Sequence, residues 1–101
     1  MKIIKHKYKH WLPPVLHASA VTLGYTIVYA MSEDKVPLWL YRHEMKHIEQ
    51  ISKLGIPRFY IQYLIEYIIG RIKGLGHWEA YRAISFEIEA VQAEKYYNIE
   101  R

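Results

Sequence analysis

The pattern of hydrophobic and polar positions divides the chain into an early part with strand-like composition and a later part with helical period. Residues 17–31 are rich in Val, Thr, Tyr and Ile, with Gly24 near the middle, which is typical of two short strands joined by a turn. From about residue 37 onward, apolar residues instead recur at intervals of three and four, the period of a helix with one buried face. We therefore predict an α+β fold in which a small N-terminal antiparallel sheet of about three strands precedes the helices.

Three helices are expected, over about residues 37–54, 58–73 and 78–97. Ser32 and the two acids after it precede the first helix, where a cap and negative charge are favourable, and Gly55 provides a left-handed residue at its end. Gly74 and Gly76 end the second helix, because glycine is a poor helix former. The third has neither glycine nor proline, so nothing in its composition predicts an interruption.

Length and composition indicate a single domain over residues 1–101. The chain is 51% hydrophobic and 15% aromatic, which provides enough apolar surface for a core and argues against disorder. It contains no cysteine, so disulfides and thiolate chemistry are excluded and a metal site would have to use His and carboxylate ligands. No export signal or membrane span is evident, and we expect a soluble, cytoplasmic protein, leaving monomer and dimer both open.

The formal charge of +4 permits a nucleic-acid or membrane-surface partner, although the excess is modest. The basic residues of the N-terminal segment are Lys2, Lys5, Lys7 and Lys9, with His6 and His10 among them. No recognised binding motif accompanies them, so a solvated strand or arm is the preferred interpretation and no nucleic-acid partner is expected. Membrane association through the middle helix is a further alternative, but we expect its apolar residues to pack against the other helices. Those residues are Phe59, Tyr60, Tyr63, Leu64, Tyr67 and Ile68.

The first predicted helix carries the pattern H-E-x-x-H at residues 43–47. Two imidazoles four residues apart project from one face of a helix and can bind one zinc ion, with Glu44 placed as a general base. Chance alone would give this pattern in roughly 3% of chains of this composition, so its surroundings matter. His43 and His47 share their stripe with apolar residues, while a separate stripe is charged, and both imidazoles should therefore point inward.

A catalytic zinc site needs a third protein ligand from elsewhere, and the last predicted helix offers two candidates. Glu87 shares its stripe with small and apolar residues, which predicts a buried carboxylate that needs a metal or a cation beside it. Glu89 lies on a more polar stripe, so it is the second candidate or, alternatively, a hydrogen-bond partner of a ligating histidine.

Residues 43–50 (HEMKHIEQ) together with residues 81–90 (YRAISFEIEA) resemble the gluzincin metallopeptidases, and more narrowly the minigluzincins. These are small soluble proteins similar to the catalytic core of integral-membrane zinc peptidases, including the prenyl-protein type. The resemblance covers most of the chain and implies zinc ligation by His43, His47 and Glu87, with Glu44 as general base. Where the membrane relatives commonly have an Asp, this chain has Val91, which removes a usual anchor for a zinc histidine.

The function expected from these residues is hydrolysis of a peptide or protein substrate by a zinc metalloendopeptidase. The alternative is a non-catalytic domain in which the same three ligands hold a structural zinc ion. A peptidase also needs a group that stabilises the transition state, and the candidates are His77, Tyr81, Tyr96 and Tyr97. A strand over residues 25–31 is expected to receive an extended substrate, and the tail at residues 98–101 is a candidate for covering the metal in a latent zymogen form.

Overall fold

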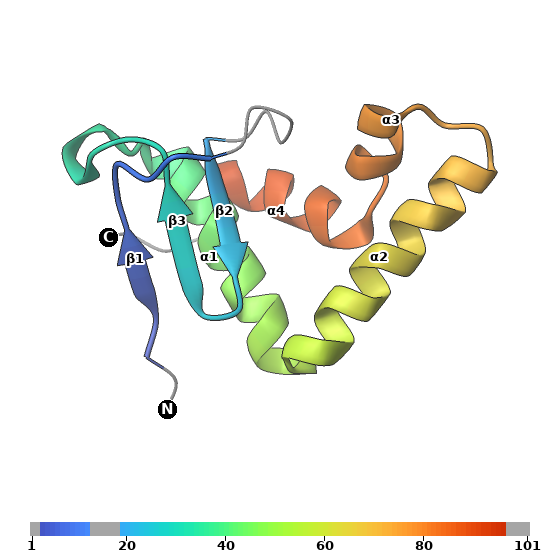
Figure 1. Cartoon of the computed structure of the whole chain (residues 1–101), viewed down its shortest axis with the longest axis horizontal. Helices are drawn as coiled ribbons and strands as arrows, with labels where there is room; N and C mark the ends of the chain where they lie inside the picture. The colour runs from blue at the N-terminus through green and yellow to red at the C-terminus, as the bar shows by residue number, and fades with distance from the viewer. Residues whose placement is uncertain (1–2, 13–18, 97–101) are drawn as a thin grey trace.

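The computed structural model describes residues 3–12 and 19–96 and has the predicted α+β architecture, with a three-stranded sheet followed by helices (Figure 1). The strands are β1 (Lys5–Lys7), β2 (Ala20–Leu23) and β3 (Thr26–Tyr29). β2 and β3 form the predicted antiparallel hairpin, and it turns at Gly24, whose φ of +60° favours glycine.

The sheet differs from the prediction in its strand direction and in the position of β3. β1 runs parallel to β3, so the sheet is mixed and not antiparallel throughout. No hairpin joins β1 to its neighbour, and alternation of side chains along a strand carries no information about direction. The strand order is β1-β3-β2, so β3 is paired on both sides and has no free edge for a substrate strand. The prediction that the strand over residues 25–31 receives an extended substrate is therefore wrong.

The helices are η2 (Glu33–Lys35, a 3-10 turn), α1 (Leu38–Leu54), α2 (Ile56–Ile72), α3 (His77–Arg82) and α4 (Ser85–Tyr96). α1 and α2 occupy nearly the predicted ranges, and Gly55, with φ of +88°, separates them. Ser32 makes no side-chain cap hydrogen bond, and the backbone C=O of Pro37 instead accepts the N–H of Tyr41 at 3.1 Å.

The predicted third helix is interrupted at residues 83–84, which divides it into α3 and α4. Glu66 of α2 accepts hydrogen bonds from the backbone N–H and the hydroxyl of Ser85, at 2.7 and 2.9 Å. Ile84 inserts into the core with 1% exposure. These tertiary contacts outweigh the helix-forming composition of the segment, and they start α4 in an orientation that lays it along α1 (Figure 1).

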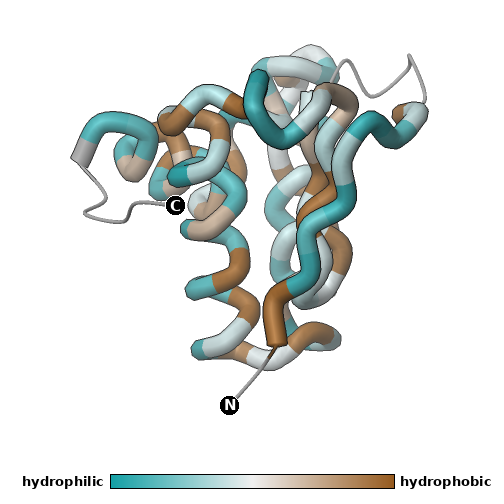
Figure 2. The backbone as a smooth tube through the Cα atoms, turned by 90° about the vertical axis from the view of Figure 1, so that its left-hand side faces the viewer, coloured by the Kyte–Doolittle hydropathy of each residue, from teal (hydrophilic) through white to brown (hydrophobic). Residues whose placement is uncertain are grey.

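Two apolar clusters stabilise this arrangement. One lies between the sheet and α1, which form separate layers when seen from the side (Figure 2). Its buried members are Ala20, Ile27, Tyr29, Val36, Leu40 and Ile48. The other joins α1, α2 and the C-terminal helices through Ile51, Phe59, Ile84 and Phe86. α1 belongs to both clusters, so its residues are held from two sides.

α2 packs differently from the prediction on one of its faces. Phe59 is buried, and Tyr60, Tyr63 and Tyr67 are partly buried against the second cluster. Leu64 and Ile68, which we had predicted to pack, are 57% and 45% exposed. At about 100° per residue the four aromatic side chains span about 100° of the helix, and Leu64 and Ile68 lie about 40° and 80° beyond the edge of that span. No helix within the described residues has the length and apolar character needed to cross a membrane.

Candidate metal centre

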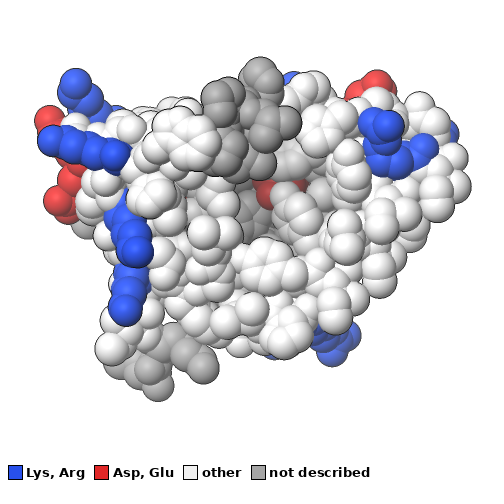
Figure 3. Space-filling view, in the orientation of Figure 1, with Lys and Arg blue, Asp and Glu red and all other residues white. Residues whose placement is uncertain are grey.

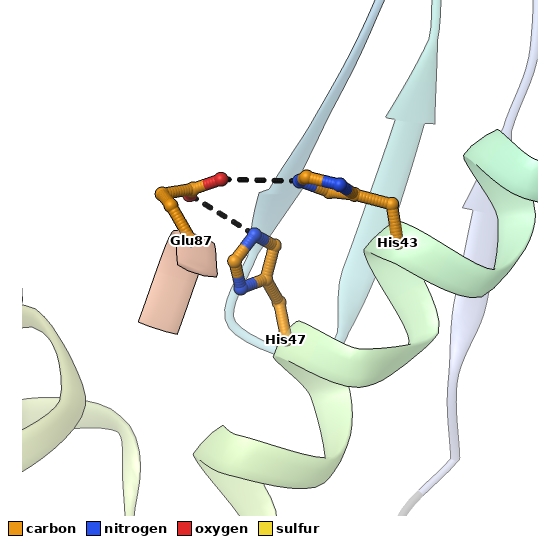
Figure 4. Close-up of side chains that lie close together, drawn as sticks. All are labelled: His43, His47 and Glu87. Carbon is orange, nitrogen blue, oxygen red and sulfur yellow. Dashed lines mark hydrogen bonds and ion pairs between the residues drawn. The ribbon is translucent and has the colours of Figure 1, made fainter. Parts of the chain in front are cut away.

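Three donor atoms converge between α1 and α4. His43 and His47 project from the same side of α1 with their ring centroids 5.0 Å apart, as the i, i+4 spacing predicts. Both Nε2 atoms face Glu87 of α4: His43 Nε2 lies 3.1 Å from Oε1 and His47 Nε2 lies 3.0 Å from Oε2 (Figure 4). One ligand atom from each of the three residues lies within 4.8 Å of the others. This group is close enough to bind one metal ion.

The outward nitrogens of both histidines also have partners. His43 Nδ1 lies 2.8 Å from the Glu94 carboxylate and His47 Nδ1 lies 2.9 Å from the side-chain oxygen of Gln50. Because these partners accept hydrogen bonds, each Nδ1 carries a proton and each Nε2 is directed toward the centre. Such partners fix ring orientation and strengthen a metal-binding imidazole.

Glu89 lies one step further from the centre. The Gln50 amide donates to the Phe86 carbonyl at 3.1 Å and to the Glu89 carboxylate at 3.0 Å. The Gln50 NH₂ group donates to both of these acceptors, so the side-chain oxygen of Gln50 is turned toward His47. Glu89 thus contacts the residue that orients a histidine, whereas the structure brings Glu87 to both imidazoles directly.

Gln50 and Glu94 were not among the site residues expected from the sequence. Both have a spacing that helical geometry could have used, since Gln50 follows His47 by three residues and Glu94 follows Glu87 by seven, which places each pair on one face. Val91, where an anchoring acid was missing, is 55% exposed. The anchors for the two histidines come from these other positions.

In the metal-free protein, Glu87 shifts the pKa values of His43 and His47, and both histidines shift that of Glu87. Burial opposes ionisation of His43, but its hydrogen bonds to Glu87 and Glu94 and the attraction of Glu44 raise the pKa of His43 to about 9. His47 is also buried, and Glu87 raises its pKa above the ordinary value in the same way. Burial raises the pKa of Glu87, and hydrogen bonds from both histidines more than offset this, so that the net shift is downward.

Metal binding should therefore release protons. His43, whose pKa is raised to about 9, carries an extra proton at pH 7 in the metal-free protein. The pKa of His47 is also raised, and a ligating nitrogen must lose any such proton. We expect more than about one proton released per zinc ion at pH 7, against about half a proton for two imidazoles with ordinary pKa values. Calorimetric titration at pH 7 in buffers of different ionisation enthalpy measures this number. A release near half a proton would contradict the ion-paired arrangement.

Glu44 lies beside the cluster and is 5% exposed. Its Oε1 accepts a hydrogen bond from the Thr22 hydroxyl of β2 at 2.7 Å, and its Oε2 lies 4.0 Å from His43 Nε2. The hydrogen bond fixes the carboxylate at the junction of α1 and the sheet. The second oxygen is therefore held next to the donor group without being one of its three converging atoms.

A cleft of about 650 Å³ opens onto the donors between β2, α1, α2 and α3, and Figure 3 shows the hollow with acidic atoms at its floor. Tyr63, Tyr81 and His77 are among its lining residues. Tyr63 donates to Glu87 Oε2 at 2.7 Å, and Tyr81 interacts with both Glu87 and Tyr63. His77 Nδ1 lies 2.8 Å from the Tyr67 hydroxyl. The Tyr96 side chain, Tyr97 and the tail at 98–101 lie outside the described residues.

The donor atoms have the chemistry that a divalent transition-metal ion requires. Two imidazoles and one carboxylate are suitable ligands, their outer atoms are anchored, and one side faces a cleft that could admit a further ligand. No protein-family model, curated protein or solved structure matches the chain.

Proposed function

We propose that the chain is a zinc-dependent peptidase in which His43, His47 and Glu87 hold the metal and Glu44 is the general base. The observation that carries this proposal is the position of Glu44, a buried carboxylate that lines the same cleft as the three donors. A hydrolase needs a proton acceptor beside its metal, and a purely structural site has no use for one. The resemblance to the minigluzincins assigns the same roles.

A zinc ion held by these residues would polarise a substrate carbonyl and acidify a water molecule. Glu44 would accept the proton at Oε2 and later deliver it to the leaving amine. The hydrogen bond from Thr22 to Oε1 leaves Oε2 for this task. Glu94 and Gln50 hold the imidazoles in position, and Tyr63 positions the Glu87 carboxylate.

The edge of β2 is the best candidate to hold an extended peptide. In the part of the chain that the structure describes, β2 is paired with β3 on one side only, and residues 19–23 line the cleft. In the antiparallel pair, which closes at Leu23 and Thr26, alternate residues direct their backbone groups outward. These are Ala20 and Thr22, so the peptide would form main-chain hydrogen bonds with them next to Glu44.

One of the outward groups is already bonded. The Tyr60 hydroxyl donates to the Thr22 carbonyl at 2.9 Å and accepts from the Gly24 N–H at 2.9 Å. Within residues 3–12 and 19–96, no hydrogen bond uses either backbone group of Ala20 or the N–H of Thr22, and these are the groups we propose for a substrate. A peptide paired with β2 would therefore form its main-chain hydrogen bonds along the stretch from Thr22 to Ala20.

Tyr81 is the better placed of the two described candidates for stabilising the transition state. It interacts with Glu87 at the centre of the site, whereas His77 forms its hydrogen bond with Tyr67. A phenolic hydroxyl there can donate to a developing oxyanion. His77 would then act at the rim of the cleft.

The alternative function is a non-catalytic zinc site that joins α1 to α4. Structural zinc sites usually have four protein ligands, whereas catalytic ones keep three and an open position. The described residues supply three converging donors, and the group lines a cleft, which favours the catalytic interpretation. The same donors also suit iron(II), so the identity of the metal is part of the test.

The proposal is tested by elemental analysis of the purified protein followed by cleavage assays on a degenerate library of internally quenched peptides. We expect about one zinc ion per chain, cleavage that a chelator abolishes, and recovery when zinc is restored. A variant ending at Tyr97 is assayed in parallel, because the tail is a candidate for inhibiting the site. Stoichiometric zinc with no cleavage by either form would favour the structural alternative.

A further inference from the structure

α2 is apolar on two opposite faces. Its inner face presents four aromatic residues to the cleft and the second cluster: Phe59, Tyr60, Tyr63 and Tyr67. Its outer face presents six aliphatic residues that are between 44% and 79% exposed: Ile61, Leu64, Ile65, Ile68, Ile69 and Ile72. A helix that is apolar all round is normally covered on both sides. Within the described residues, only the inner face is covered.

The six side chains form one continuous strip. At 100° per residue they fall within an arc of about 140° that runs along most of the helix. Exposed apolar surface this continuous marks an interaction site, whereas scattered apolar residues need no explanation.

Basic residues border the strip at both ends. Arg58 lies near its start, Arg71 and Lys73 lie near its end, and all three are exposed. The one acid of α2, Glu66, is turned away and bonded to Gln62 and Ser85. Figure 3 shows that the surface over the length of α2 is largely uncharged in this view. The occupant of this face should therefore combine an apolar region with negative charge.

A second copy of the chain does not have that chemistry. A twofold contact through α2 would place Arg58 of one copy near either Arg58 or Arg71 of the other, depending on the helix direction. Like charges would then meet at both ends, and Glu66 is not free to neutralise them. A protein partner is also disfavoured, because interface anchors are enriched in Tyr and Trp and the aromatic residues of α2 all lie on its inner face.

We infer that the outer face of α2 docks on an anionic lipid bilayer, with the six aliphatic side chains in the acyl boundary and the basic residues among the headgroups. An apolar helix face in the acyl boundary with basic residues at headgroup level is the arrangement of a helix that lies in the plane of the membrane. The docked surface is opposite the aromatic face that lines the cleft, so the cleft stays open. Docking does not depend on the proposed peptidase activity.

Vesicle co-sedimentation tests the inference, with vesicles of phosphatidylcholine alone and of phosphatidylcholine mixed with phosphatidylglycerol. We expect the full chain to prefer the anionic vesicles by tenfold or more, and added salt to weaken this preference. Replacing two strip residues, I65S with I68S, should reduce binding at least tenfold. Replacing two cations, R58Q with R71Q, should reduce it about 25-fold, since each basic residue contributes about fivefold.

The matched control is I88S with V91S, which removes two comparably exposed apolar residues from α4 and should bind vesicles like the unchanged chain. Equal binding to both kinds of vesicle, no binding, or equal loss in the α4 control would each overturn the inference. A dimer in sedimentation velocity that I65S with I68S dissociates would assign the strip to a second copy instead. Circular dichroism establishes that each variant is folded.

Discussion

Replacing Glu44 with glutamine is expected to reduce peptide cleavage about 10³-fold while leaving zinc content unchanged, because removal of a general base costs this much. Glutamine has the shape of glutamate, and its side-chain oxygen can still accept the hydrogen bond from Thr22 that Glu44 accepts at 2.7 Å. The fold and the three donors should therefore be unaffected. The loss should appear in kcat/KM on a quenched peptide that the unchanged chain cleaves.

The matched control is Glu49→Gln, on the same helix. Glu49 pairs with Lys46 and Lys53 at 3.1 Å each, away from the donor cluster, so its replacement should change cleavage less than twofold. If Glu44→Gln cleaved as fast as this control, Glu44 would not be the general base. If it lost zinc together with activity, the carboxylate would be part of the metal shell.

The fold and the three converging residues could be predicted largely from local patterns. The i, i+4 spacing predicts His43 and His47 on one inward face, because residues four apart lie on the same side of an α-helix whatever packs against it. Glu87 could be selected over Glu89 because its neighbours are small or apolar, and this pattern reports close packing. The structure places Glu87 against both imidazoles.

Features that depend on tertiary contacts could not be predicted in this way. The break before Ser85 is held by Glu66, nineteen residues away, and no local signal marks it. The direction of β1 depends on how the chain crosses the sheet and not on its side-chain alternation. The exposure of Leu64 and Ile68 follows from which apolar face of α2 meets the core, and a sequence with apolar residues on both faces does not specify that choice.

Replacing Glu87 with alanine is expected to abolish stoichiometric zinc binding, whereas Glu89→Ala should retain it. Glu87 is the only carboxylate among the described residues in the converging group, and loss of even an outer partner of a ligand costs about 10- to 100-fold in affinity. The loss for Glu87→Ala should therefore exceed roughly 100-fold. Glu89 reaches His47 only through Gln50, so its effect should be tenfold or less. Competition with a chromophoric chelator measures both affinities.

Because Glu87 also balances the buried His47 imidazole and the partly buried His43 imidazole, the alanine variant risks unfolding for reasons unrelated to metal. Glu87→Gln resolves this, since the amide fills the same space and can still accept one hydrogen bond but is a much weaker ligand. We expect this variant to be folded by circular dichroism and to bind zinc at least 100-fold more weakly. Full zinc retention by folded Glu87→Gln, together with loss in Glu89→Ala, would move the third ligand to Glu89. The cleft chemistry would then have to be derived around a carboxylate that is half exposed and lies beside Lys46.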